Sequence, residues 1–458
     1  MVKSLKSLAL NLNEYEYIGE DVAITGAHIN SKEISKGQLF VALQSLRDGH
    51  DFIEDAIANG AVAILVNKKQ SVLEVSQIIV NDTRKALFDL ALIYRKTLSI
   101  PVLSITGSCG KTTTKEMLVC MLKAFGKVHY SEGSFNNDLG VAMTVLSTPQ
   151  YADFVVIEAG TNAPGEILHL TQLIQPDCAA ITNVSASHLE KLKSLEGVMI
   201  EKGALLKAIK GNGKAIINLD DPRINSFSKD LSVDKITFSM IKTNADIYLC
   251  DQIKSVKMLG FTLSIKAKLY DVQLNIIGTH NIQNILTAIS FIHALQLDIQ
   301  GALKSLSNYQ PCQGRFSLAC LNNYITVIDD TYNASVQSVK AAIKNLPKFS
   351  GDKYIVLSNI GELGEYSEVY HQEIGRLINK SVIDYVYLYG NKKWMTSLAK
   401  ETGYNARYFE NKNELIWALF DDLKRNNYIL SCILVKGSRA NKMEEVVEAL
   451  TKYYKKIE

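Results

Sequence analysis

The residues with the clearest chemical potential lie in one short segment, ITGSCGKTT, at residues 105–113. The usual phosphate-binding loop reads G-x-x-x-x-G-K-[ST] and would need a glycine at position 105, where this sequence has isoleucine. Its glycines stand at 107 and 110, so the loop reads T-G-x-x-G-K-T. Backbone N–H groups in such a loop can hold phosphates, Lys111 can reach the terminal phosphates, and Thr112 can hold Mg²⁺.

We therefore predict a nucleotide-binding loop in this segment; the alternative is a glycine-rich turn with an exposed lysine. The residues expected to contact the nucleotide are Gly107, Ser108, Cys109, Gly110, Lys111, Thr112 and Thr113. We interpret Cys109 as a small loop residue.

A carboxylate follows a second apolar segment. Residues 154–157 read FVVI, which is typical of a buried strand, and Glu158 comes directly after them. A carboxylate at the carboxyl end of a strand beside a phosphate loop is placed to bind Mg²⁺, directly or through water. A glutamate in this position can also cap a helix or lie solvated in a loop. We predict the metal role.

Two further segments carry polar residues after a strand or at the start of a helix. His188 lies in ITNVSASHLE, and Lys202 follows in the helix-like IEKGALLKAI, although that spacing does not by itself establish a joint role. Asn281 and Asn284 lie three positions apart on one face of an expected helix. Their amides suit the edge of a nucleobase, and helix capping by Asn281 is an equal alternative.

The elements that must position these residues alternate between strand and helix. The apolar segment 101–105 precedes the loop, and a helical pattern follows it with its apolar face at Met117, Leu118, Met121 and Leu122. Three α/β domains are expected: a small N-terminal domain (1–83), a central domain with a mostly parallel sheet and the phosphate loop (84–311, with a connector helix at 84–98), and a C-terminal Rossmann-like domain (312–458).

Composition excludes several classes of protein. The 458 residues are 47% hydrophobic and 21% charged, with a formal net charge of +3 and no basic block, which argues against nucleic acid as a partner. No apolar segment approaches the roughly 18 residues of a membrane span, and no signal peptide is evident, so we expect a cytoplasmic protein. The seven cysteines are scattered without a C-x-x-C pair, as is usual for reduced thiols.

Together these segments resemble the Mur ligases. The motifs are TGSCGKTTTKEML, SFNNDLG, VIEAGTNAPGEI, ITNVSASHLE, NLDDP, GTHNIQNILTA, GRF, IDDTYNAS, GELGEYSEVYHQEIG and VKGSRANKMEEVV, and they occur in that family's order along essentially the whole chain. The resemblance is to the members that join D-alanyl-D-alanine to UDP-N-acetylmuramoyl-tripeptide through an acyl phosphate, with ATP and two Mg²⁺ ions, in peptidoglycan synthesis. It implies a monomeric enzyme.

The resemblance also implies roles for single residues. Lys111 would bind the β and γ phosphates, Thr112 and Glu158 a Mg²⁺, and His188 a second Mg²⁺. Lys202 falls where these ligases carry a carbamylated, metal-binding lysine. Asn281 and Asn284 would contact adenine, Arg315 the phosphates and Asp330 the ribose. Asn136 and Asn137 would lie near the muramoyl peptide, and Ser31 near the uridine nucleotide.

The sequence departs from the family pattern at a few positions. Asn30-Ser31-Lys32 stands where an Asp-[Ser/Thr]-Arg motif is usual, Ser134 where Asn is common, and Ser358-Asn359-Ile360 where Gly-Asp-Met precedes E-L-G. Three alternatives therefore stay open. Folylpolyglutamate synthase should lack the N-terminal domain, and the ligase that adds the third peptide residue should carry an Asp-Asn-Pro-Arg motif, which is absent. A nucleotide-binding regulator without catalysis would not need to retain Lys111, Glu158, His188 and Lys202.

Overall fold

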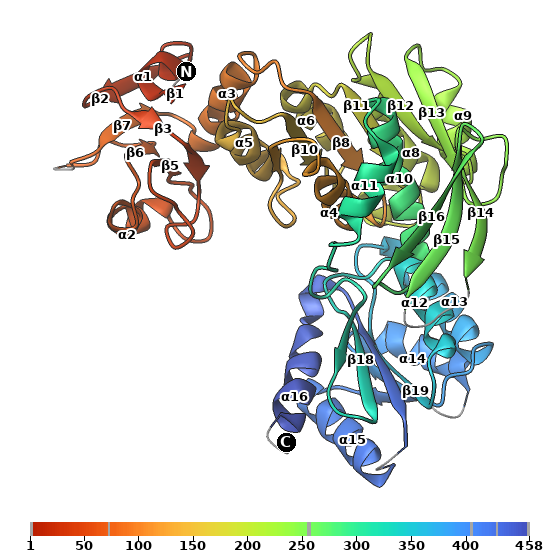
Figure 1. Cartoon of the computed structure of the whole chain (residues 1–458). Helices are drawn as coiled ribbons and strands as arrows, with labels where there is room; N and C mark the ends of the chain where they lie inside the picture. Colours follow the sequence, from red (N-terminus) through yellow and green to blue (C-terminus); the bar gives the residue numbers. More distant parts are fainter. Residues whose placement is uncertain (1–2, 72–73, 254–257, 404–405, 427–428, 456–458) are drawn as a thin grey trace.

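The computed structural model describes residues 3–71, 74–253, 258–403, 406–426 and 429–455. The described chain forms three sheet-based units that follow one another along the sequence, with the central unit between the other two (Figure 1). Within these ranges, no helix combines the length and the apolar content needed to cross a bilayer.

The N-terminal unit is a five-stranded sheet in the order β2-β7-β6-β5-β4. These strands are β2 (Tyr15–Ile18), β4 (Gly26–His28), β5 (Gln38–Val41), β6 (Ala63–Val66) and β7 (Ser76–Val80). Its other elements are β1 (Lys3–Ser4), α1 (Leu5–Ala9), β3 (Ala23–Ile24) and α2 (Ile53–Ala58). β5 and β6 are rich in apolar residues, and their buried side chains fill the core between the sheet and its helices.

The central unit contains a nine-stranded sheet in the order β16-β15-β14-β13-β12-β11-β8-β10-β9. The seven neighbouring strands β14-β13-β12-β11-β8-β10-β9 pair in parallel, and β15 and β16 add an antiparallel edge. The strands are β8 (Val102–Thr106), β9 (Val128–Tyr130), β10 (Phe154–Glu158), β11 (Cys178–Ile181), β12 (Lys214–Asn218), β13 (Asp234–Ser239), β14 (Ile247–Ile253), β15 (Leu259–Ile265) and β16 (Lys268–Leu274). The expectation of a mostly parallel sheet is confirmed.

Helices cover both faces of this sheet. One face carries α4 (Lys111–Leu122), α10 (His280–Ala294) and α11 (Ile299–Leu306). The other carries α3 (Thr83–Arg95), α5 (Asp138–Ser147), α6 (Glu166–Ile174) and α8 (Leu195–Lys207), with the short α7 (Leu189–Leu192) and α9 (Pro222–Ser228) beside them. Both faces of the sheet are therefore buried, which explains the continuous apolar strands of the sequence.

The C-terminal unit is a six-stranded sheet in the order β17-β18-β22-β19-β20-β21. Its strands are β17 (Ser317–Cys320), β18 (Ile325–Asp330), β19 (Asp352–Ser358), β20 (Tyr385–Tyr389), β21 (Ala406–Phe409) and β22 (Ser431–Lys436), and only β17 pairs antiparallel. The helices are α12 (Val336–Asn345), α13 (Ser367–Asn379) and α14 (Lys392–Thr402) on one face, and α15 (Lys412–Arg425) and α16 (Glu444–Tyr454) on the other.

The order of the central strands fixes where chemistry can occur. β8 lies between β10 and β11, so the carboxyl ends of these three parallel strands meet at one edge. The phosphate loop leaves β8, Glu158 ends β10, and Thr182 and Asn183 follow β11. In an open parallel sheet, ligands bind at this edge.

Candidate active site

A cleft of about 820 Å³ opens at this edge of the central sheet. Residues from the connector helix α3, the central unit and the C-terminal unit all line it. Of the residues singled out in the sequence, Ser108, Cys109, Gly110, Lys111, Thr112, Thr113, Asn136, Asn137, Glu158, His188, Asn284, Arg315 and Asp330 lie on its wall. Gly107, Lys202 and Asn281 lie behind that wall, and Ser31 belongs to the N-terminal unit.

The two glycines of the loop are required by its geometry. Gly107 has φ +151°, and a Cβ there would lie 1.9 Å from Thr182 Oγ1. Gly110 has φ +81° and caps α4, and a Cβ there would lie 2.4 Å from Asn284 Oδ1. Because neither contact is possible for a side chain, the loop is a tightly constrained strand-to-helix turn. The N-terminus of α4 points its free backbone N–H groups at the cleft.

The segment that follows β11 forms hydrogen bonds with the backbone of the phosphate loop. Asn183 Oδ1 accepts the Cys109 N–H at 3.1 Å, and Asn183 Nδ2 donates to the Cys109 carbonyl at 3.1 Å. The Thr182 hydroxyl donates to the same carbonyl at 2.6 Å, and the Ser108 N–H donates to the Asn183 carbonyl at 3.0 Å. Sequence reasoning missed Asn183, although its place directly after a strand beside the loop strand was a usable signal.

Thr112 and Glu158 form the polar centre of the cleft. The Thr112 hydroxyl donates to Glu158 Oε2 at 2.7 Å, and Asn136 Nδ2 donates to Glu158 Oε1 at 2.8 Å. Arg315, from the C-terminal unit, donates from Nη2 to the Thr112 hydroxyl at 2.9 Å and lies 3.9 Å from the centre of the Tyr332 ring. Glu158 is 1% exposed. A buried carboxylate and a hydroxyl in contact are oxygen donors of the kind that Mg²⁺ takes.

Lys111 is the first residue of α4 and is half-buried, not an exposed loop lysine as the alternative interpretation required. Its Nζ donates to the Gly107 carbonyl at 2.8 Å, within the loop itself. Burial lowers the pKa of Lys111, while the nearby Glu158 acts in the opposite direction. A phosphate in the cleft would stabilise the charged form of this side chain.

Lys202 lies on α8, is fully buried, and has no hydrogen-bond partner for its Nζ among the described residues. Burial lowers the pKa of Lys202 well below its ordinary value, and the positive charge of Lys111 lowers it further. An unpaired ammonium in this position would be costly, so burial favours the neutral form of the amine.

Glu201, its neighbour, is also buried and was missed in the sequence. It accepts hydrogen bonds from the Thr161 hydroxyl, the Gly165 N–H and the Ile167 N–H, at 3.1, 2.7 and 2.7 Å. This carboxylate holds the loop after β10 against the start of α6.

His188 is placed by the turn before α7 and lines the cleft. Its Nδ1 contacts the carboxylate of Glu362, which belongs to the C-terminal unit. The His188 ring and the charge of Lys191 hold the pKa of Glu362 below its ordinary value, although partial burial opposes them. Glu362 lies within the GELGEY motif, but the sequence offered no indication that it would face His188.

Asn281 and Asn284 lie on α10 as expected and are both buried. Asn284 Nδ2 donates to Asn281 Oδ1 at 3.0 Å, Asn281 Nδ2 donates to the Ile277 carbonyl at 2.8 Å, and the Thr114 hydroxyl donates to Asn284 Oδ1 at 3.3 Å. Asn281 does not cap the helix, because α10 begins at His280 and its N-cap position is Thr279. The capping alternative is therefore wrong, and the pair ties α10 to α4 behind the cleft.

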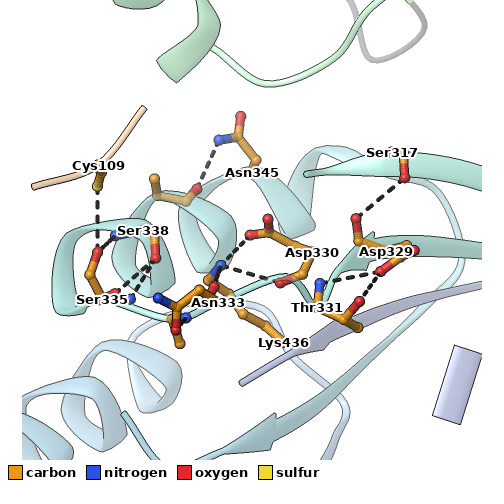
Figure 2. A network of polar contacts seen from close by, with 12 residues as sticks. Cys109, Ser317, Asp329, Asp330, Thr331, Asn333, Ser335, Ser338, Asn345 and Lys436 are labelled. Atoms are coloured by element: carbon orange, nitrogen blue, oxygen red, sulfur yellow. Dashed lines mark hydrogen bonds and ion pairs between the residues drawn. The ribbon is translucent and has the colours of Figure 1, made fainter. Parts of the chain in front are cut away.

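A second polar network lies where the C-terminal unit meets the phosphate loop (Figure 2). Lys436 Nζ pairs with Asp330 Oδ2 at 2.7 Å and donates to the Asn333 carbonyl at 2.9 Å. Burial raises the pKa of Asp330, and Lys436 opposes that shift. Figure 2 also shows the Cys109 thiol directed at Ser335, with 3.4 Å between Sγ and Oγ.

The departures from the family pattern have local structural roles. Asn30 Oδ1 accepts the Lys32 N–H at 3.1 Å, which forms a turn around Ser31. Asn359 Oδ1 accepts hydrogen bonds from the Asn391 N–H at 3.0 Å and from Asn441 Nδ2 at 2.9 Å. Ser134 accepts the Asn136 N–H with its carbonyl at 2.7 Å, and Asn137, which matches the family pattern, caps α5 by accepting the Gly140 N–H at 2.9 Å.

A phosphate loop, a buried carboxylate beside it and an arginine from a second unit define an ATP-dependent, phosphoryl-transferring enzyme. Residues 23–112, 105–292 and 314–439 match the families described as "Mur ligase family, catalytic domain", "Mur ligase middle domain" and "Mur ligase, glutamate ligase domain". The UDP-N-acetylmuramoyl-tripeptide--D-alanyl-D-alanine ligase of Buchnera aphidicola (subspecies Acyrthosiphon pisum) is 36% identical over 456 residues, 99% of each chain. The chain belongs to the Mur ligase family, whose members are ADP-forming ligases.

Solved structures agree with this assignment. A crystal structure of MurF from Acinetobacter baumannii has a TM-score of 0.89 and 27% identity, with 99% of both chains covered. The MurF ligase from Thermotoga maritima, solved in complex with ADP, has a TM-score of 0.81 and 28% identity over 94% of this chain and 98% of that one. The expected three-unit α/β architecture is confirmed.

Proposed function

We propose that this enzyme joins D-alanyl-D-alanine to UDP-N-acetylmuramoyl-tripeptide, with cleavage of ATP to ADP and phosphate. The name of the Buchnera relative and its near-complete coverage support this substrate pair. The single observation that carries the proposal is the chain of hydrogen bonds from Arg315 through Thr112 to Glu158. It joins two units of the protein at the phosphate loop, where a transferring phosphoryl group would lie.

The reaction proceeds in two steps. A terminal carboxylate oxygen of the tripeptide attacks the γ phosphorus of ATP; the bond to the bridging oxygen of ADP breaks, and an acyl phosphate forms. The amine of D-alanyl-D-alanine then attacks the acyl carbon, phosphate leaves, and the amine loses a proton. Negative charge grows on oxygens in both steps, so Lys111, Arg315 and the N–H groups of α4 stabilise the transition states electrostatically.

The donor set fits Mg²⁺. Thr112, Glu158 and His188 line one cleft, and Lys202 lies buried behind it. In the described part of the chain, no three His, Cys, Asp or Glu side chains gather closely enough to hold a metal ion. A carbamate on Lys202 would add an anion to this donor set. Bound Mg²⁺, which we place at two sites, would neutralise the phosphate oxygens.

The carbamate proposal rests on the amine of Lys202, which is buried, has no hydrogen-bond partner among the described residues, and has a pKa that burial lowers. Such an amine can attack CO₂, forming an N–C bond and losing a proton, and the product is an anion that binds metal. Lys202→Ala is expected to lose most activity and to regain part of it with acetate. The carbamate itself is measured in the parent protein by ¹³C NMR under ¹³CO₂. Absence of that signal together with full activity of Lys202→Ala would overturn the proposal.

The remaining substrate contacts follow the same assignment. We place adenine near Asn281 and Asn284, the ribose at Asp330, the muramoyl peptide near Asn136 and Asn137, and the uridine nucleotide near Ser31. In this scheme residues 1–83 bind the UDP-linked substrate, residues 84–311 bind ATP, and residues 312–458 complete the site. We propose a cytoplasmic, monomeric enzyme.

The acceptor distinguishes this function from its alternatives. A pocket that pairs with the amide and carboxylate of a dipeptide leaves polar groups unpaired when a single amino acid binds, at about 1–3 kcal/mol each. Two such losses would lower kcat/KM by a factor on the order of 10² to 10⁴. The test measures ADP release with D-Ala-D-Ala, D-Ala, L-Lys and meso-diaminopimelate, each with its matching UDP-linked peptide. A single amino acid that equals the dipeptide would contradict the proposal, as would absence of ADP release with every acceptor.

A further inference from the structure

Two loops from different units meet at the metal-binding histidine proposed above. The first runs from His188 to Glu190 at the start of α7, in the central unit. The second runs from Glu362 to Gly364, between β19 and the 3₁₀ helix Gly364–Tyr366, in the C-terminal unit. The His188 side chain is 22% exposed and that of Glu362 is 56% exposed, and Nδ1 of the first contacts Oε2 of the second.

The backbones of the two loops are fitted to one another. The Glu190 N–H donates to the Glu362 carbonyl at 3.1 Å. His188 and Glu362 both have left-handed backbones, with φ of +53° and +61°. Non-glycine residues keep this conformation only where their surroundings hold it. A Cβ at Gly364 would lie 3.0 Å from the Glu190 Cα, so the second loop passes close over the first and even an alanine side chain there would be tightly crowded.

The contact at Nδ1 determines what the other ring nitrogen can do. A metal-binding histidine usually donates from its second nitrogen to a carboxylate, which fixes the ring orientation and leaves a lone pair on the first. Glu362 places a carboxylate in contact with that second nitrogen, and it comes from a different unit than the other expected metal-binding residues. Without the C-terminal unit in this position, His188 would lack this partner.

We propose that Glu362 is a positioning residue that orients His188 for metal binding only when the C-terminal domain is docked. This inference rests on the proposed function, because it takes His188 as a metal-binding residue. Docking of the domain then brings two groups to the cleft: Arg315 reaches Thr112 directly, and Glu362 acts through His188. The metal site is complete only in the docked arrangement.

The test compares four variants of the full chain. Glu362→Ala removes the carboxylate, and Glu362→Gln keeps an oxygen that can accept the Nδ1–H. Gly364→Ala crowds the two loops against each other and strains the left-handed backbone at this position, without changing any charge. Glu365→Gln is the matched control, since this exposed glutamate lies three positions away in the 3₁₀ helix that follows and outside the cleft lining. Mn²⁺ binding is measured by electron paramagnetic resonance with β,γ-methylene-ATP, and kcat, KM and thermal stability are measured in parallel.

Glu362→Ala and Gly364→Ala are expected to weaken Mn²⁺ binding and to lower kcat by about 10- to 100-fold, while the KM for ATP stays within about threefold of the parent value. Glu362→Gln should recover most of both losses, and Glu365→Gln should match the parent.

Parent-like Mn²⁺ affinity in Glu362→Ala would show that the contact only docks the domain, and the proposal would be wrong. If that variant does not fold, parent-like affinity in Gly364→Ala overturns the proposal in the same way. The outcome stays separate from the function itself: a parent protein that binds Mn²⁺ but releases no ADP with the tripeptide and D-Ala-D-Ala contradicts the proposed reaction alone.

Discussion

Lys111 shows how a single side chain can be essential to the reaction and minor for stability. Its Nζ donates a hydrogen bond to the Gly107 carbonyl, and its position at the start of α4 lines the cleft. Lys111→Ala is expected to abolish ADP release while it changes the free energy of unfolding by less than about 1 kcal/mol. Lys123→Ala, at the exposed end of the same helix, is the control. Ligation near the parent rate in the Lys111 variant would contradict the phosphate-loop assignment.

Lys3 provides a prediction about pH. Its Nζ donates to the Thr25 carbonyl at 3.1 Å and to the Leu146 carbonyl at 2.6 Å, and burial lowers its pKa from 10.5 to about 8. Between these two values the unfolded chain binds more protons than the folded chain, so the contribution of Lys3 to the free energy of unfolding rises with pH.

Thermal unfolding of the parent and of Lys3→Met, followed from pH 7 to pH 10, checks this sign. The midpoint of the parent should rise relative to that of Lys3→Met above pH 8, with the exposed Lys6→Met as control. A difference that stays constant with pH would show that the Lys3 pKa is not lowered.

Single residues were predictable from the sequence where a local pattern surrounds them. Glu158 ends a buried strand, and Lys111 follows a glycine loop between strand and helix, so both could be assigned without a structure. Glu201 and Glu362 could not, because each acts on a segment distant in the sequence and no local pattern marks that partner, whereas Asn183 was signalled only by its place directly after a strand. Their partners appear only when the chain is folded.

At the scale of elements, the start of α6 depends on a residue of another helix. Glu201, on α8, accepts three hydrogen bonds from the segment Thr161–Ile167 and is 5% exposed. Glu201→Ala would leave buried donors unpaired at about 1 kcal/mol or more each, so the free energy of unfolding of the central unit is expected to fall by roughly 2–4 kcal/mol. Urea unfolding measures the loss, and the exposed Glu196→Ala on α8 is the control. A loss equal to that of the control would contradict this role.

The type and order of elements were the most predictable feature of the fold. The strand predicted at 154–157 is present as β10, since buried parallel strands are continuous apolar segments. The strand order was not predictable, because β8 pairs with β10 and β11, which follow it much later in the chain. That order is what places Glu158 and Asn183 beside the loop.

At the scale of the whole molecule, Arg315 links the C-terminal unit to the phosphate loop. Its guanidinium donates to the Thr112 hydroxyl and stacks on Tyr332, and a lysine can reproduce neither geometry. Because ATP can bind the central unit first, Arg315→Lys is expected to lower kcat by about 10-fold or more with little change in the KM for ATP. Arg376→Lys, in an exposed ion pair with Glu401, is the control. A change confined to KM would place Arg315 in ground-state binding instead.

The hydrogen bonds from Thr182 and Asn183 to the phosphate loop have a consequence for attempts to transfer this loop to another protein. Asn183 and Thr182 form hydrogen bonds with the backbone N–H and carbonyl of Cys109, and Thr182 also fills the space beside Gly107. The conformation of the loop therefore depends on two segments that lie far apart in the sequence: the loop itself and the residues that follow β11. The segment TGSCGKTT alone is not expected to keep this conformation in another protein. A graft of this loop into a foreign strand–helix unit would hold phosphate only if a threonine and an asparagine were transplanted to the neighbouring strand with it.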